Sequence, residues 1–416
     1  MTDVNLDLRG RPAEAQTAAL LEQFRALRGQ GATVRALVDD KPARLYVSML
    51  EGGFRVRLER SSDGSTMLVL KPDGSTPRRQ PGAHSLVVHP DGRVYVNTTG
   101  DRVAVLDGAS RKVLRHIPVG RDPQHLGLSP DGSRLYVANS GSNDVSVIDT
   151  RTDMVVGTGA TGRRPLLPCV ASDGNLFLPS GPDETVTALD AGGQPLATLP
   201  VGSSPHDIAV SPDAHWAYQP NSGSHAVTII DAQRRSVAGE IKVGLGPGHI
   251  AFTADSRFAF VANTLSDDVS VVDVGSHEVV GTIPAGVGAH MPVLSHDGTR
   301  GYVADFAADD LTVWDVEKRE ALGSIPVGIY PHAFGVSPDD EWLVVSNTGE
   351  SSVCVVDARE RRTVARLDVG GGPGHVDFDP DGECAFVGCQ ISNQVAAVDF
   401  RRQRVIELID VGTPAV

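Results

Sequence analysis

A unit of about 42 residues occurs eight times in succession between Pro81 and Gly412. The clearest copy runs from Arg121 to Gly162 and reads RDPQHLGLSPDGSRLYVANSGSNDVSVIDTRTDMVVGTGATG. The other copies begin at Pro81, Arg163, Ser203, Leu245, Val287, Ile329 and Gly371. Repeats of roughly 40–45 residues with several short strands are typical of β-propellers, because neighbouring units bury the sheet faces that one unit leaves open. The eight copies therefore predict eight blades.

Each copy predicts four strands in the same order. In the clearest copy a short apolar run at 126–128 leads to Ser-Pro-Asp-Gly at 129–132, a turn in which Pro fixes φ and Gly supplies a positive φ. The segment RLYVAN at 134–139 alternates and is rich in aromatic and β-branched residues, which predicts a half-buried strand. The segments VSVID at 145–149 and VVGTGATG at 155–162 complete the unit as third and outer strands. The last blade is expected to meet the first by edge pairing or by a strand donated from the segment near Pro81.

An aspartate closes the third predicted strand of every copy. We interpret these aspartates as turn caps, because a carboxylate at this place can accept backbone N–H groups of the following turn. They are Asp107, Asp149, Asp190, Asp231, Asp273, Asp315, Asp357 and Asp399.

The motif Ser-Pro-Asp-Gly followed by Tyr-Val-Ala-Asn, at 129–139, resembles the YVTN family of propeller repeats. The resemblance covers about four-fifths of the chain and implies a propeller, whereas it indicates little about function because propellers serve as scaffolds, lactonases and redox enzymes. Many relatives have seven blades. The eight-bladed domain that holds haem d in the cytochrome-type nitrite reductase is distantly similar.

The first 76 residues follow a different pattern. They predict strand, helix, strand, helix and a two-stranded hairpin, over 4–10, 12–27, 33–39, 42–53, and 54–60 with 66–72. This order and the opening Leu-Asp-Leu-Arg-Gly resemble the small two-layer α/β domain of the sulfur carrier TusA and of a family related to it. The sulfur carriers hold a cysteine after the first strand, where this chain has Gly10-Arg11-Pro12-Ala13, so we do not expect persulfide transfer.

The predicted organisation is therefore a TusA-like α/β module at 1–76, a linker at 77–83 and an eight-bladed, mainly β propeller at 84–416. The module is expected to dock a protein partner or to mediate dimerisation.

The charge balance argues against nucleic acid as a partner. The chain has 37 Lys and Arg against 52 Asp and Glu, a net charge of −15, which repels phosphate backbones. It contains no run of about 18 apolar residues, and its N-terminus lacks a basic start followed by an apolar core. We therefore expect a cytoplasmic protein without a membrane partner.

Seven of the 13 histidines stand at the start of a predicted innermost strand: His84, His125, His206, His249, His290, His332 and His375. Only the third copy lacks one, and it has Leu167 and Pro168 instead. Because the innermost strands line the central channel and the loops between blades lie on one face, these imidazoles are expected at one mouth of the channel. Three of them precede the turn aspartate by six residues and four by seven. Since side chains alternate along a strand, this offset predicts two layers.

So many imidazoles point to a metal centre. Neutral imidazole is the commonest side-chain ligand for copper, zinc and iron, and a nitrogen-rich site favours copper. Asp305 and Cys389 are further candidate ligands, because they replace the asparagine that ends the second strand in half of the copies. The layout resembles that of nitrous oxide reductase, a propeller that binds a copper cluster with histidines from many blades, although that family's local motifs are absent.

The sequence thus predicts a metal-dependent redox protein that acts on a small molecule, with copper preferred and iron or noncovalent haem as alternatives. A second interpretation is a noncatalytic scaffold, in which each histidine bonds a carbonyl of a neighbouring blade. The six other histidines are interpreted as surface residues: His89, His116, His215, His225, His277 and His296.

Overall fold

The computed structural model describes residues 4–8, 34–38, 54–60, 66–72 and 82–412. The chain divides into two compact units, Met1–Arg79 and Gln80–Val416. In the first unit, strands β1 (Val4–Asp7), β2 (Val34–Val38), β3 (Phe54–Arg60) and β4 (Thr66–Pro72) pair in the order β1-β2-β4-β3. β1 is parallel to β2, and the other pairs are antiparallel. The helices predicted at 12–27 and 42–53 lie outside the described residues, and so does the position that a sulfur carrier's cysteine would occupy.

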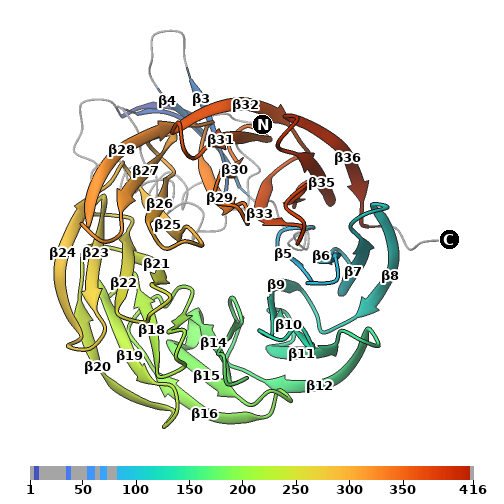
Figure 1. The fold of residues 1–416 in the computed structure, drawn as a ribbon, viewed down its shortest axis with the longest axis vertical. Helices are drawn as coiled ribbons and strands as arrows, with labels where there is room; N and C mark the ends of the chain where they lie inside the picture. Colours follow the sequence, from blue (N-terminus) through green and yellow to red (C-terminus); the bar gives the residue numbers. More distant parts are fainter. Residues whose placement is uncertain (1–3, 9–33, 39–53, 61–65, 73–81, 413–416) are drawn as a thin grey trace. The chain divides into compact units, whose positions relative to one another are not determined.

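The second unit is an eight-bladed β-propeller, as the eight repeats predicted (Figure 1). Each blade is an antiparallel sheet of four consecutive strands, with the first innermost and the fourth outermost. Blades 1 to 4 are β5–β8 (Leu86–Val88, Arg93–Thr98, Arg102–Asp107, Lys112–Pro118), β9–β12 (Pro123–Leu128, Arg134–Asn139, Asp144–Asp149, Met154–Ala160), β13–β16 (Cys169–Val170, Leu176–Ser180, Thr185–Leu189, Pro195–Pro200) and β17–β20 (Ala209–Val210, Trp216–Asn221, Ala226–Asp231, Ser236–Lys242).

Blades 5 to 8 continue the same order. They are β21–β24 (Pro247–Phe252, Phe258–Asn263, Asp268–Asp273, Glu278–Pro284), β25–β28 (Ala289–Leu294, Arg300–Asp305, Asp310–Asp315, Glu320–Pro326), β29–β32 (Pro331–Val336, Trp342–Asn347, Ser352–Asp357, Arg362–Asp368) and β33–β36 (Pro373–Phe378, Ala385–Cys389, Gln394–Asp399, Arg404–Asp410). The described part of the chain has one helical element, a 3-10 turn at Gly181–Asp183 between β14 and β15. Among these residues no helix is long and apolar enough to cross a membrane.

The second strand of a blade is buried on both faces, so the prediction of a half-buried strand at 134–139 was wrong. In β10, Leu135 and Val137 pack into a cluster with blade 1, whereas Tyr136 and Ala138 pack into a cluster with blade 3. The alternation in the sequence therefore separates two apolar faces, each covered by a different neighbour.

The turn aspartates have the predicted role. Each of the eight accepts a hydrogen bond from a backbone N–H two or three residues further on, at 2.6–3.0 Å. These caps fix the turn between the third and outer strands, and they explain the recurrence of aspartate without a catalytic role.

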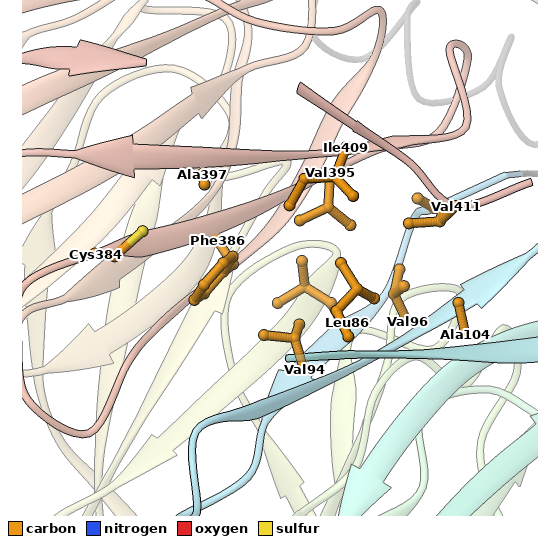
Figure 2. Packing of buried hydrophobic residues seen from close by; sticks show 12 residues of the cluster. Leu86, Val94, Val96, Ala104, Cys384, Phe386, Val395, Ala397, Ile409 and Val411 are labelled. Carbon is orange, nitrogen blue, oxygen red and sulfur yellow. The ribbon is translucent and has the colours of Figure 1, made fainter. Parts of the chain in front are cut away.

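Blades 8 and 1 close the ring by packing their faces together, and not by the edge pairing or donated strand expected from the sequence (Figure 2). Phe386 and Val395 of blade 8 belong to one buried cluster with Leu86, Val94 and Val96 of blade 1. No strand needs to cross the junction. Each blade already contains four strands, and both faces of its sheet are apolar.

A buried carboxylate adds a polar link to this junction. Asp377 of β33 accepts a hydrogen bond from the backbone N–H of Val88 in β5 at 2.8 Å, and the N–H of His375 donates to the carbonyl of His84 at 3.2 Å. Burial raises the pKa of Asp377 to about 6, although backbone N–H groups of Val88 and Phe378 favour its charged form. The innermost strands of the last and first blades are thereby joined.

Replacing Asp377 by Ala should destabilise the ring by about 1–3 kcal/mol, because the N–H of Val88 loses its acceptor inside the blade interface. Urea denaturation of the full chain measures this loss. Asp381→Ala, at an exposed turn of the same blade, is the matched control and should change the free energy of unfolding by less than about 0.5 kcal/mol. Equal stability of the two variants would contradict the role of Asp377 in closure.

Candidate functional site

The seven histidines lie where the sequence placed them, at the start of the innermost strands. His125, His249, His290, His332 and His375 lie within β9, β21, β25, β29 and β33. His84 lies two residues before the start of β5, and His206 lies three residues before the start of β17. They come from blades 1, 2 and 4 to 8, and their ring contacts join successive blades.

Within residues 82–412, ring nitrogens converge in two groups of three. The first triad, defined as His84, His125 and His375, comes from blades 1, 2 and 8, and the second triad, His206, His249 and His290, comes from blades 4, 5 and 6. In each triad the possible ligand atoms, one per residue, all lie within 4.8 Å of one another.

His332 of blade 7 lies between the triads. Its ring centroid is 5.5 Å from that of His290 and 6.3 Å from that of His84. From blade 4 through blades 5 to 8 and on to blades 1 and 2 the imidazoles form a continuous row. Between blades 2 and 4 the row is interrupted, because blade 3 has Leu167 in place of a histidine.

The prediction of two layers based on the one-residue offset was wrong, because each triad contains histidines of both spacings. The physical reason is a set of β-bulges. The innermost strands of blades 2, 5, 6, 7 and 8 change register beside the histidine, and His249, His290 and His375 lie inside such irregularities. A bulge absorbs the extra residue and redirects the side chain, so position around the ring decides which histidines meet.

Several ring nitrogens are buried without a protein partner. The Nδ1 atoms of His84 and His125 in the first triad, and of His206 and His290 in the second, have no hydrogen-bond partner within the described part of the chain. A buried polar atom left unpaired costs about 1–3 kcal/mol. This argues against the interpretation in which each imidazole bonds a neighbouring carbonyl, and it is the arrangement expected of side chains that await a ligand.

A carboxylate that the sequence did not assign to the metal site lies beside the second triad. Asp207 Oδ2 is 3.5 Å from Nδ1 of His249, and the carboxylate accepts a hydrogen bond from the backbone of Leu167 in blade 3. Burial opposes its charge, but the nearby His206, His125 and His375 outweigh burial and lower the pKa of Asp207. One indication of this role was present in the sequence, because Asp207 directly follows a ring histidine and belongs to the blade next to the one that lacks such a histidine.

Six of the ring histidines have a lowered pKa and are held in the neutral form that metals require: His84, His125, His249, His290, His332 and His375. Burial, followed by the charges that His375 and His125 would carry, moves the pKa of His84 well below its ordinary value. Burial and then neighbouring imidazoles likewise lower the pKa of His249 and His290 strongly, that of His332 to about 4 and that of His375 to about 3. The site therefore presents nitrogen lone pairs at neutral pH.

Asp305 and Cys389 lie outside the two triads. Asp305 is fully buried at the end of β26, where its Oδ2 accepts the hydroxyl of Thr312 at 2.6 Å and burial raises its pKa. Cys389 is also fully buried, its Sγ lies 3.7 Å from the carbonyl oxygen of Val387, and burial raises the pKa of the thiol to about 11. Backbone N–H groups of Gly286 and Gly370, in the connections from the preceding blades, also bond Asp305 and Cys389 respectively.

Four of the histidines interpreted as surface residues are instead half-buried and join neighbouring blades. His116 Nε2 lies 2.9 Å from the carbonyl oxygen of Val411, and the N–H of Gly246 donates to Nδ1 of His225 at 3.1 Å. His89 Nε2 lies 2.9 Å from the carbonyl of Gly132, and His277 Nδ1 lies 2.7 Å from the hydroxyl of Tyr218. A turn whose sequence predicts exposure can thus be partly buried when it lies beside the neighbouring blade. His296 is exposed, with 58% of its side chain accessible, and it serves below as a control.

Comparison with known proteins agrees with this architecture. Residues 182–363 and 328–413 match the family described as lactonase, 7-bladed beta-propeller, and together they span more than half of the chain. The chain belongs to this lactonase-type propeller family. Its ring nevertheless has eight blades, because all eight repeats form complete sheets.

This member of the lactonase-type family has a curated relative, the seven-bladed beta-propeller protein Rv1057 of Mycobacterium tuberculosis. The two are 30% identical over 180 residues, a match that covers 33% of this chain and 46% of the relative. The chain thus spans less than half the length of that relative.

Two solved structures have a similar fold. Dihydro-heme d1 dehydrogenase NirN, solved in complex with DHE, is 18% identical with a TM-score of 0.63, and the match covers 82% of this chain and 76% of that one. Hydrazine synthase of Kuenenia stuttgartiensis is 20% identical with a TM-score of 0.55, over 79% of this chain and 98% of that one. At these identities the comparison shows a shared propeller fold.

The metal-free protein should lose stability on acidification through its ring histidines. The pKa of His332 and of His375 is lower in the folded state than the unfolded value near 6.5, so below about pH 6.5 the unfolded chain binds protons first and stability falls until the pH reaches the folded values. His375→Gln should reduce the loss between pH 7 and pH 5 by about 1–2 kcal/mol, as measured by urea denaturation with a chelator present. His296→Gln should leave the loss unchanged. The same pH dependence in wild type and His375→Gln would show that this imidazole is not held neutral by the fold.

Proposed function

We propose that the propeller is a metal-dependent redox protein that binds copper through the ring histidines and acts on a small molecule at that mouth of the ring. The observation that carries the proposal is the convergence of six imidazoles into two groups whose possible ligand atoms lie within 4.8 Å of one another. Three nitrogen donors from three separate strands are an arrangement that transition metals use and that stability alone does not need.

The donor set fits copper. It consists of neutral imidazoles, with no cysteine in either triad, and four of their Nδ1 atoms are buried without a partner. Burial lowers the pKa of five of the six triad rings, so these rings need not lose an extra proton before a metal binds at neutral pH. A bound copper ion would supply one-electron chemistry. Apart from ligation, His332 lies within reach of both triads and can hold or move a proton between them and a substrate.

Haem is the second candidate cofactor. It is favoured by the fold shared with NirN, whose structure contains DHE, and by the aromatic surroundings of one imidazole. The ring centroid of Phe306 lies 5.6 Å from that of His290, and Tyr330 packs behind it at 4.9 Å. A planar cofactor could stack against such a wall. Copper is preferred because both triads are compact sets of donors, whereas an axial haem ligand requires only one or two imidazoles.

The family description suggests lactone hydrolysis, but the ring gives it less support. A calcium-dependent lactonase needs several carboxylates at one site. Of the three aspartates near the innermost strands, Asp207 lies among imidazoles, whereas Asp305 and Asp377 are engaged within blade 6 and at the junction of blades 8 and 1. The mouth is therefore rich in nitrogen rather than in oxygen donors.

Metal analysis and an absorption spectrum of the protein as isolated test the proposal. We expect stoichiometric copper after expression with added copper, and no haem band. His206→Ala and His249→Ala should each weaken copper binding at their own group of three histidines at least about tenfold, because ligands of one ion act as a unit. His296→Ala should keep the wild-type copper content.

Three results would decide against copper in different ways. A haem spectrum that disappears in His290→Ala would favour the second candidate. Iron in place of copper would keep the metal centre and change its chemistry. Protein free of metal and haem after expression with copper, iron and haem precursors would contradict the whole proposal and leave a noncatalytic scaffold.

We further propose that residues 1–76 recruit a protein partner and take no part in metal binding. The support is the separation of the chain into two units and a complete ring within Gln80–Val416. A chain that begins at Gln80 should therefore keep the copper content of the full-length protein, measured by metal analysis after gel filtration. Loss of copper from a truncated chain with unchanged circular dichroism would instead make the first unit part of the site.

A further inference from the structure

We infer that the ring holds two separate metal sites: one of imidazoles alone at the first triad, and one at the second triad whose affinity is raised by direct contact with the carboxylate of Asp207. This inference rests on the proposed metal-binding function and specifies its stoichiometry and its ion preference. Neither the family match nor the similar structures assign these sites.

The separation follows from the blades that supply the ligands. The first triad comes from blades 8, 1 and 2, and the second from blades 4, 5 and 6, so the two occupy opposite arcs of the ring. Blade 7 contributes His332 between them, and blade 3 contributes Leu167, which has no ligand atom in its side chain. No histidine belongs to both triads, and each triad already offers the three protein ligands of an open transition-metal site.

The first triad consists of imidazoles alone, and Asp207 lies near His125 and His375 without a direct contact to either. Its three rings approach one another with centroid distances of 5.2–5.9 Å, and Nδ1 of both His84 and His125 is buried without a hydrogen bond. Soft cations of low charge suit such a set, because little positive charge then remains uncompensated in a partly buried site. We assign Cu(I) to it as the preferred ion.

The second triad has a carboxylate partner. Its rings are closer, with centroid distances of 4.5–5.6 Å, and Asp207 Oδ2 lies 3.5 Å from Nδ1 of His249. A carboxylate at Nδ1 orients the ring, leaves Nε2 as the ligand atom and raises its basicity. The backbone of Leu167 holds Asp207 in place from the neighbouring blade. Asp207 is thus a positioning residue, and its negative charge favours a divalent ion such as Cu(II) at this triad.

Separate titrations of the metal-free full-length protein with Cu(I) and with Cu(II) test the inference, with metal analysis of both series and electron paramagnetic resonance of the Cu(II) series. Wild type should bind two ions per chain, and the second triad should fill first. His125→Ala and His290→Ala should each keep one ion with a different resonance spectrum, and the double variant should keep none. His84→Ala and His206→Ala replace them if either variant does not fold, and His296→Ala is the control for two ions.

The role of Asp207 is tested by comparing the effect of its substitution on the two triads. Asp207→Asn should weaken Cu(II) binding at the second triad by about 10–100-fold and change the resonance spectrum of that ion. Affinity at the first triad should fall by a smaller factor, because Asp207 lies near His125 and His375 without contacting them. Asp207→Glu should restore most of the affinity, which a purely structural role would not predict. An equal loss at both triads would overturn the role assigned to Asp207.

The outcomes separate this inference from the proposed function. One ion per chain that is lost in His125→Ala as well as in His290→Ala would indicate a single shared centre, which overturns the inference and leaves the metal function intact. Failure of wild type to bind either Cu(I) or Cu(II) would overturn both.

Discussion

Each blade depends on its neighbours to cover both of its faces. The middle strands carry apolar side chains on each side, as in β10, where Leu135 and Val137 pack against blade 1 and Tyr136 and Ala138 against blade 3. A single four-stranded sheet of this kind would expose two apolar surfaces to water. The ring is the arrangement in which every such surface has a partner, and the place of the histidines follows from it, because closure brings eight strand starts around one centre.

The number of blades and the place of the ring histidines could be predicted from the sequence because both depend on the period of the repeat. The turn aspartates repeat at fixed spacing, and their local hydrogen bonds need no knowledge of distant residues. The strand at 134–139 was predicted to be half-buried because its residue types alternate. The same alternation also occurs in a strand with two apolar faces, each packed against a different blade. Tyr136 looks like a residue at a partly wet surface until blade 3 is placed against it.

The grouping of the histidines could not be read from spacing, because it depends on bulges and on contacts between blades. His249 and His290 differ in their distance from the turn aspartate, yet irregularities at both positions bring them into one triad. Asp207 acquires its place from His249, 42 positions away, and from the backbone of Leu167, 40 positions away. Blade 3 has no ring histidine, and it contributes the backbone of Leu167 as a hydrogen-bond partner of Asp207 instead.

The junction between blades 8 and 1 is built from face packing, with no exchanged strand. It therefore has the same construction as the other seven boundaries. The ring would close in the same way if the propeller began at any other blade. A circularly permuted propeller that began with blade 5 and finished with blade 4 would contain the same eight interfaces and the same circle of imidazoles. Topologically, the molecule is a closed cycle cut at one of eight equivalent places.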